Sequence, residues 1–271
     1  MRYLITLALA TLCHGELLAQ SHGLFEKQLF IVGEDTLPCR ILTPANYSPA
    51  KKYPLLVFLH GAGERGNDNE KQLFWGSGLF TDSLNRLRYP AIVVFPQCPT
   101  NSYWANVTRT DRKDSLGGFV FDTAATAPKK PLGLMLQFID TLLAHGTVDP
   151  QRVYIAGLSM GGFGTFEALW RRPELFAAAM PICGGGRTEY VKKYAPKLPI
   201  WVFHGDADPV VPVLFSRMMV DALKKQGAKV KYTEYPGVGH DSWQNAFREP
   251  EFLSWLFAQR KTGKPSRKTA P

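Results

Sequence analysis

Hydrophobic residues gather in continuous runs along most of this chain, instead of alternating with polar ones. The runs cover residues 53–60, 91–95, 152–156, 177–182 and 200–203, and a further strand is predicted over 230–235. Continuous apolar runs of this length are typical of strands buried on both faces of a parallel sheet. The pattern therefore predicts a mostly parallel sheet.

Helix-compatible segments separate these runs. They cover residues 132–144, 162–171, 214–225 and 244–259. At the N-terminal end, residues 29–32 and 37–42 predict a β-hairpin that turns across 33–36. The alternation of strand and helix predicts a doubly wound α/β fold, with helices on both faces and ligands at the carboxyl ends of the strands.

The segment 101–130 interrupts this rhythm. It is polar, contains Gly117-Gly118, and has no clear hydrophobic periodicity. Connections of this length are usually functional loops or lids. We expect the segment to lie near a functional site.

Composition sets the size and class of the molecule. The chain has 271 residues, of which 45% are hydrophobic. That suits one α/β domain, and no apolar run approaches the roughly 20 residues of a membrane span. Residues 1–20 resemble a signal peptide, with a basic start, an apolar core over 3–12 and cleavage near Ala19 or Gln20. We expect a domain over 21–260, a basic disordered tail over 261–271, and export to the periplasm or the cell exterior.

The net charge of +9 suggests at first a nucleic-acid partner. Part of it comes from Lys261, Lys264, Arg267 and Lys268 in the tail, and no basic helix with interleaved aromatics occurs. We therefore expect a solvated basic surface and no nucleic-acid partner. The sequence does not indicate an oligomeric state.

Cysteines and metal ligands are sparse. Removal of the leader leaves Cys39, Cys98 and Cys183, an odd number that allows at most one internal bridge. Buried free thiols are as consistent with their apolar surroundings as a bridge. No cluster of His, Cys, Asp and Glu has metal-ligand spacing, so we expect no metal and no cofactor.

The segment Gly157-x-Ser159-x-Gly161 carries the strongest chemical signal. An apolar run enters it and a helix-compatible segment leaves it, which is the context of a nucleophile elbow. A serine at such a tight turn is strained, so the residues two before and two after it must be small. A glycine-rich turn with an incidental serine is the alternative.

A serine hydroxyl needs a base to take its proton and an acid to orient that base. In this fold the order along the chain is Ser, Asp or Glu, then His, each in a loop after a strand. His240 is the predicted base, whereas His204, at a strand end, is expected to be structural. Asp208 is favoured as the acid because it lies farther along its loop than Asp206, which we expect to stabilise a turn.

Two backbone amides are expected to form an oxyanion hole. One belongs to Met160, which follows the serine and begins the next helix, and the other to Ala62 in the glycine-rich loop 60–66. The alternative for that loop is a phosphate cradle, but the Lys-Ser/Thr ending of such loops is missing.

Four segments together, LHGAGERG, GLSMGGFGT, HGDADPVVP and GHDSW, resemble the α/β-hydrolase superfamily. The chain is most similar to exported bacterial carboxylesterases of the prolyl-oligopeptidase-like and phospholipase/carboxylesterase-like group, near feruloyl and acetyl-xylan esterases and polyhydroxybutyrate depolymerases. The resemblance runs from the hairpin to the last helix. It implies that the acid is the aspartate before Pro209, namely Asp208. A propeller domain has no room here, which disfavours cleavage of oligopeptides.

Trp104, in the irregular loop, and Trp243, just after the base, are candidates for a substrate pocket, with plain packing as the alternative. Glu64 and Arg65 are further candidates, and they could instead pair with one another or orient the oxyanion loop. Together these residues predict a metal-independent serine esterase for small or aryl esters, free or polysaccharide-linked. A small exported peptidase, a polyester depolymerase and a non-catalytic binding module are the alternatives.

Overall fold

A computed structural model describes residues 22–112 and 114–261 of the chain. An eight-stranded sheet runs through it in the order β1-β2-β4-β3-β7-β8-β9-β10. Its strands are β1 (Glu26–Val32), β2 (Asp35–Leu42), β3 (Tyr53–Leu59), β4 (Ile92–Pro96), β7 (Val148–Leu158), β8 (Ala178–Ile182), β9 (Ile200–Gly205) and β10 (Val230–Tyr235). Every pair from β4 to β10 is parallel, and β1 and β2 form the antiparallel edge. The predicted parallel sheet and N-terminal hairpin are confirmed.

The strand order reverses between β3 and β7. β4 follows β3 in the sequence and lies on one side of it in the sheet. β7 lies on the other side of β3, and β8, β9 and β10 follow in order beyond β7. β3 and β7 end side by side, with Leu59 paired to Gly157. Loops that leave such a switch point diverge and open a crevice at the carboxyl edge of the sheet. The loop that begins at His60 and the turn at Ser159 both start there.

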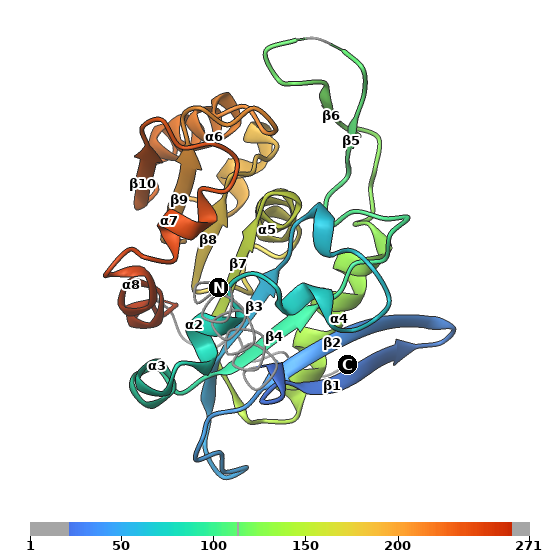
Figure 1. Ribbon diagram of the computed structural model, residues 1–271, viewed down its shortest axis with the longest axis vertical. Helices are drawn as coiled ribbons and strands as arrows, with labels where there is room; N and C mark the ends of the chain where they lie inside the picture. Colours follow the sequence, from blue (N-terminus) through green and yellow to red (C-terminus); the bar gives the residue numbers. More distant parts are fainter. Residues whose placement is uncertain (1–21, 113, 262–271) are drawn as a thin grey trace, which may run out of the picture.

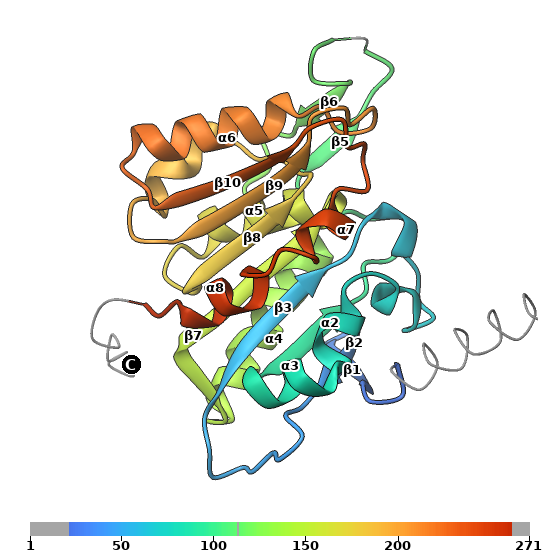
Figure 2. The ribbon, with the colours of Figure 1, turned by 60° about the vertical axis from the view of Figure 1, so that its left-hand side comes forward.

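Helices cover both faces of the sheet (Figures 1 and 2). One face carries α4 (Lys130–Ala144), α5 (Met160–Arg171) and α6 (Leu214–Lys225). The opposite face carries α2 (Ser77–Thr81), α7 (Trp243–Ala246) and α8 (Phe252–Ala258), with α3 (Ser83–Arg88) next to α2. Short 3₁₀ helices span η1 (Ala62–Glu64), η2 (Lys71–Leu73) and η3 (Thr188–Lys193).

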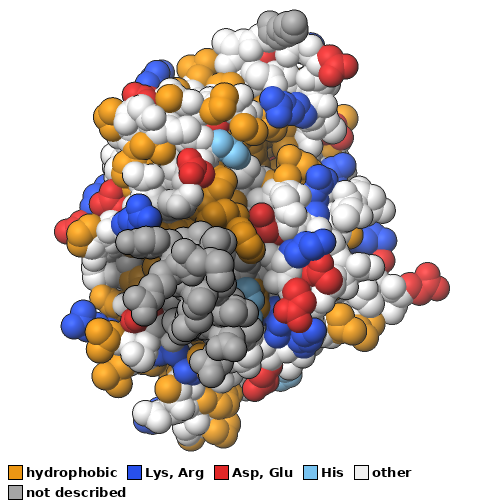
Figure 3. Space-filling view, viewed as in Figure 1, with side chains coloured by type: hydrophobic (Ala, Val, Ile, Leu, Met, Phe, Trp, Pro, Cys, Tyr) orange, Lys and Arg blue, Asp and Glu red, His pale blue; other side chains and the backbone are white. Residues whose placement is uncertain are grey.

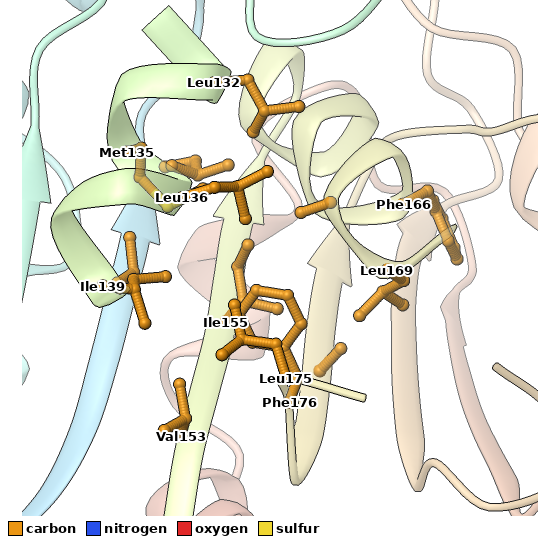
Figure 4. Close-up of a cluster of buried hydrophobic side chains, with 14 of the residues drawn as sticks. Leu132, Met135, Leu136, Ile139, Val153, Ile155, Phe166, Leu169, Leu175 and Phe176 are labelled. Atoms are coloured by element: carbon orange, nitrogen blue, oxygen red, sulfur yellow. The ribbon is translucent and has the colours of Figure 1, made fainter. Parts of the chain in front are cut away.

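The core under α4 and α5 shows why the apolar runs fold in this way. Leu132, Met135 and Ile139 of α4 repeat at helical spacing and meet Val153 and Ile155 of β7 (Figure 4). All of these side chains are fully buried or nearly so. Each contributes about 1.5–3 kcal/mol to the folded state by leaving water, so this layer fixes the position of α4 against the sheet.

The helix predicted over 244–259 is wrong as one element. The chain forms two short helices there, α7 and α8, with Pro250 between them. Proline lacks an amide hydrogen and its ring clashes with the carbonyl four residues earlier, so a continuous helix cannot pass through it.

The segment 101–130 also differs from the irregular loop that its sequence predicted. It folds into a small antiparallel ribbon of β5 (Val107–Arg109) and β6 (Phe119–Phe121). We call residues 107–112 and 114–121 the hairpin arm. Figure 1 shows the arm projecting from the body of the molecule, beyond the carboxyl ends of the central strands.

Several expectations fall at the ends of the chain. The predicted signal peptide over 1–20 and most of the predicted tail over 261–271 lie outside the described residues. Lys261 is described, and its ammonium group donates to the carbonyls of Glu174 and Leu175 at 3.1 Å each. Within the described ranges, no helix combines the length and the apolarity that crossing a bilayer requires.

The three cysteines of the described ranges, Cys39, Cys98 and Cys183, are free thiols, and each is buried. Burial raises the pKa of the Cys98 thiol to about 12 and raises those of the other two as well. The free-thiol alternative therefore holds and the bridge does not.

Candidate active site

Ser159 occupies the sharp turn between β7 and α5. Its backbone has φ 52° and ψ −116°, a conformation that side chains other than glycine rarely adopt. Close packing forces the turn to be narrow: a Cβ at Gly157 would lie 2.4 Å from the carbonyl oxygen of Gly161, and one at Gly161 would lie 2.0 Å from that of Leu59. The predicted need for small residues on both sides of the serine is confirmed.

The serine hydroxyl lies at the end of a hydrogen-bonded chain of three side chains. Its Oγ is 2.9 Å from Nε2 of His240, and Nδ1 of His240 is 2.7 Å from Oδ2 of Asp208. Because the carboxylate can only accept when ionised, Nδ1 carries the proton and Nε2 is left to accept from the serine. The structure thus brings together three residues that lie 32 to 81 positions apart in the sequence.

Asp208 is held from several directions and its side chain has no exposure. Oδ1 accepts from the amides of Val210 and Val211 at 2.8 and 2.9 Å. Burial by itself raises the pKa of the carboxyl, but hydrogen bonds from His204, His240 and Val211 outweigh it and hold the pKa well below its usual range. The carboxylate is therefore ionised at neutral pH.

His204 contacts the same carboxylate. Its Nε2 is 3.2 Å from Oδ2 of Asp208 and 2.9 Å from the carbonyl oxygen of Val211, while its Nδ1 is 2.7 Å from Oγ of Ser216. His204, which the sequence predicts to be structural, also helps to fix the acid. Asp206 instead accepts from the amide of Gly237 at 2.7 Å, as expected of a turn residue.

The glycine-rich loop after β3 passes beside the serine. A Cβ at Gly61 would come within 3.7 Å of Cβ of Ser159. Ala62 begins η1 and Met160 begins α5, so the amides of both residues precede any intrahelical acceptor. Both residues line the cleft above Ser159.

His60 is the internal brace of that loop. Its Nε2 accepts from the amide of Cys98 at 2.9 Å, so its Nδ1 carries the proton and donates to the carbonyl of Gly61 at 2.6 Å. Burial lowers the pKa of His60 to about 4, which keeps the ring neutral.

Trp104 does not line the cleft, and the prediction that it contacts substrate is wrong. Its side chain is fully buried, and its indole N–H donates to the carbonyl of His60 at 3.1 Å. The ring also meets the imidazole of His60 edge-on, with centroids 5.3 Å apart. Burial of a large aromatic with a satisfied N–H is the packing alternative that the sequence left open.

Arg65 forms a hydrogen bond with the backbone of the glycine-rich loop. Like Trp104, it is not among the described residues that line the cleft. It donates to the carbonyls of Ala62 at 2.9 Å and Thr100 at 3.1 Å. Its place outside the lining of the cleft disagrees with its prediction as a substrate contact, and its hydrogen bond to Ala62 fits the alternative of orienting the loop. No ion pair joins it to Glu64 within the described ranges.

Glu64 and Trp243 do line the cleft. Burial raises the pKa of the Glu64 carboxyl, with hydrogen bonds from the backbone of Gly61 acting against that change. The indole of Trp243 meets the ring of His240 edge-on, with centroids 5.4 Å apart and planes at 87°. Trp243 thus contacts the base as well as the cleft.

The cleft has a volume of about 360 Å³, and Figure 3 shows a hollow bordered by hydrophobic side chains with a histidine at its edge. Its lining also includes residues that were not predicted: Trp75, Tyr103, Arg109, Phe119, Phe163, Val210 and Val211. Phe163 lies one helical turn after Ser159, so helical spacing could have indicated it. The others lie on loops and on the hairpin arm, where the sequence gives no comparable signal.

Cys183, at the end of β8, lies close to the acid and the base. Its sulfur and one ligand atom each of Asp208 and His240 lie within 4.8 Å of one another. Sequence spacing could not show this cluster, because its members come from three different loops. A metal ion could be held there only by engaging the imidazole and the carboxylate that lie in line with Ser159.

Comparisons with known proteins place this chain in a family. Residues 46–254 match the Phospholipase/Carboxylesterase family. The acyl-protein thioesterase 1 of Neurospora crassa is 35% identical over 217 residues, which cover 74% of this chain and 84% of the relative. An endo-1,4-beta-xylanase/feruloyl esterase of Xylanibacter ruminicola is 30% identical over 209 residues, 76% of this chain but only 25% of that protein.

A solved structure of a thermostable esterase superposes with a TM-score of 0.79 and 40% sequence identity. The match covers 89% of this chain, and this chain spans 64% of that one. The fold is therefore that of the α/β-hydrolases, and the chain is a carboxylic ester hydrolase. On the extent of the family match and the identity to these relatives, the chain belongs to the phospholipase/carboxylesterase family.

Proposed function

We propose that the chain hydrolyses small or aryl carboxylic esters through Ser159, His240 and Asp208. The observation that supports this most directly is the hydrogen-bonded line from Ser159 Oγ through the imidazole of His240 to the buried carboxylate of Asp208, at 2.9 and 2.7 Å. That line supplies a nucleophile, a base in the required tautomer and an orienting acid.

In this mechanism Ser159 attacks the ester carbonyl while His240 accepts its proton at Nε2. The carbonyl oxygen becomes an oxyanion, which the amides of Ala62 and Met160 stabilise. His240 then donates the proton to the departing alcohol, which leaves an acyl-serine. Water attacks the acyl group, again with His240 as base, and the acid product is released. Asp208 stays ionised throughout and stabilises the imidazolium as it forms.

Ser159→Ala tests the catalytic assignment. We expect ester hydrolysis to fall by several orders of magnitude with an unchanged melting temperature, since the strain of the elbow lies in the backbone and not in the hydroxyl. A fluorophosphonate should label Ser159 in the wild type and nothing in the variant. Retention of more than about 1% of wild-type kcat would reject the assignment.

The size and lining of the cleft support small or aryl substrates. Its volume of about 360 Å³ lies near the lower limit for small-molecule sites, and aromatic side chains form much of its wall. One relative is named a feruloyl esterase and another an acyl-protein thioesterase. Comparing kcat/KM for acetyl, butyryl, feruloyl and palmitoyl esters, with palmitoyl thioester alongside, decides between these classes. A palmitoyl preference would overturn the proposal.

The peptidase alternative is tested with amide and ester substrates that share one acyl group, and the depolymerase alternative with a solid polyester. We expect ester turnover to exceed amide turnover by orders of magnitude.

Export, which we also propose, relies on the leader predicted over 1–20. N-terminal sequencing of protein recovered from the periplasm or the medium should find a start near residue 20 or 21.

A further inference from the structure

One basic and one acidic residue are among those that line the cleft above Ser159. Glu64 lies on the wall formed by the oxyanion loop, and Arg109 lies on the wall formed by the hairpin arm. Among the described residues that line the cleft, Arg109 is the only lysine or arginine. Figure 3 shows Lys or Arg side chains on the side of the hollow nearest the arm. An ester bound in the cleft therefore has a cation from the hairpin arm and a carboxyl group from the oxyanion loop among its surroundings.

Arg109 rests on an aromatic platform. Its guanidinium carbon lies 5.3 Å from the ring centroid of Phe119, and that ring stacks on Phe163 with centroids 5.2 Å apart and planes at 19°. Its Nε donates to the carbonyl of Gly117 at 3.4 Å. Phe163 belongs to the helix that begins directly after Ser159, so the platform ties the position of the cation to that of the serine.

Among the described residues, no carboxylate forms an ion pair with the guanidinium of Arg109. Its neighbour Arg112 pairs with Asp114 at 3.2 Å, whereas no carboxylate in the described part of the chain lies within 4.0 Å of Arg109. A positioned arginine with unused N–H donors fits a carboxylate in a bidentate manner.

We propose that Arg109 binds a carboxylate carried by the ester substrate. This inference depends on the proposed esterase function and specifies its substrate class: half-esters of dicarboxylic acids, or esters whose alcohol part is acidic, such as a uronate-containing saccharide. Because Arg109 is the one cation among the described lining residues, the substrate carboxylate is directed towards the hairpin arm.

Two matched pairs of substrates identify which half of the ester carries the charge. 4-Nitrophenyl succinate and 4-nitrophenyl butyrate differ in a carboxylate on the acyl part. The acetates of 4-hydroxybenzoate and 4-hydroxybenzamide differ in a carboxylate on the alcohol part. For each pair we take the ratio of kcat/KM for the anionic ester to kcat/KM for the neutral ester. Comparing this ratio between two enzymes cancels the difference in intrinsic reactivity of the two esters.

The enzymes to compare are the wild type, Arg109→Gln and Arg112→Gln, the last being the matched control on the same arm. For one pair we expect Arg109→Gln to lower kcat/KM of the anionic ester about fivefold, the size expected for one partly exposed ion pair, and that of the neutral ester less than twofold. Arg112→Gln should leave the ratio unchanged, and added salt should reduce the wild-type preference.

If Arg109→Gln lowered kcat/KM equally for the anionic and the neutral esters, the proposal would be overturned and Arg109 would be a packing residue. The same conclusion would follow if the ratio of anionic to neutral kcat/KM stayed unchanged in both pairs. Failure of the proposed function is a separate result, because the wild type would then hydrolyse none of the four esters faster than Ser159→Ala does.

Discussion

At the scale of single residues, the carboxylate of Asp208 decides how His240 is held. It is ionised and buried, and it accepts from Nδ1 of His240 at 2.7 Å. An amide in its place can present an N–H to the ring and stabilise the wrong tautomer. We expect Asp208→Asn to lower kcat by up to about 10⁴-fold, the loss known for the best-studied serine triad.

Asp206→Asn is the matched control, since Asp206 lies two residues earlier in the same loop and only supports the turn at Gly237. It should keep most of the activity. Steady-state kinetics on one chromogenic ester compares the two variants. If Asp206→Asn were the crippling change, the assignment of the acid would be wrong.

His204 offers a second prediction at this scale. It contacts Asp208 at 3.2 Å, and its side chain has no exposed surface. We expect His204→Gln to lower kcat about tenfold at nearly constant KM, since small displacements of a catalytic group are costly and a 1 Å misplacement can cost about 10². Ser216→Ala, which removes the next member of the network, should have a smaller effect. A rise in KM without a fall in kcat would argue against a positioning role.

At the scale of elements, the elbow joins β7 to α5 with no room for a side chain at Gly161. A Cβ there would overlap the carbonyl of Leu59 in β3, which is backbone and cannot move aside. We expect Gly161→Ala to reduce the free energy of unfolding by about 3 kcal/mol or to prevent folding. Urea denaturation measures the change.

Gly78→Ala is the control for the elbow, because Gly78 lies in α2 with nothing within 4 Å of the added methyl group. Alanine is favoured over glycine within helices, so this variant should be as stable as the wild type or slightly more stable. Equal stability of the two variants would show that the turn tolerates widening.

The elements also show how much of this molecule its sequence predicts. The continuous apolar runs predicted the parallel strands, and the loops that follow them predicted Ser159, Asp208 and His240 as neighbours, because parallel strands bring their carboxyl ends to one edge. The walls of the cleft follow no such rule. Trp75 and Tyr103 reach the cleft from loops, and Trp104, with the same aromatic character as either, is buried instead. Loop geometry decides this difference, and no periodicity encodes it.

At the scale of the whole molecule, a buried neutral histidine makes stability depend on pH. The pKa of His60 is about 4 in the folded chain and near 6.5 when unfolded. As the pH falls from 6.5 to 4, the unfolded chain binds a proton that the folded chain does not. The free energy of unfolding should therefore fall over that interval, by about 3 kcal/mol in total from this residue, and this contribution should level off below pH 4.

Urea denaturation at a series of pH values, compared between the wild type and His60→Gln, isolates this contribution from that of the carboxyl groups. The difference between the two proteins should shrink as the pH falls. His145→Gln, at an exposed position at the end of α4, serves as the control. Parallel curves for the wild type and His60→Gln would contradict the prediction.

The three buried thiols of the described residues can report local unfolding of the structure around them. Cys39 lies in the antiparallel edge, Cys98 after β4 and Cys183 behind the base, and burial raises the pKa of each thiol. A thiol reagent such as 5,5′-dithiobis(2-nitrobenzoate) should modify them only when the surrounding structure opens. Mass spectrometry of each labelled peptide over time would then give the opening rates of three separate regions, and rapid labelling of Cys183 alone would identify the loops around the base as the first to open.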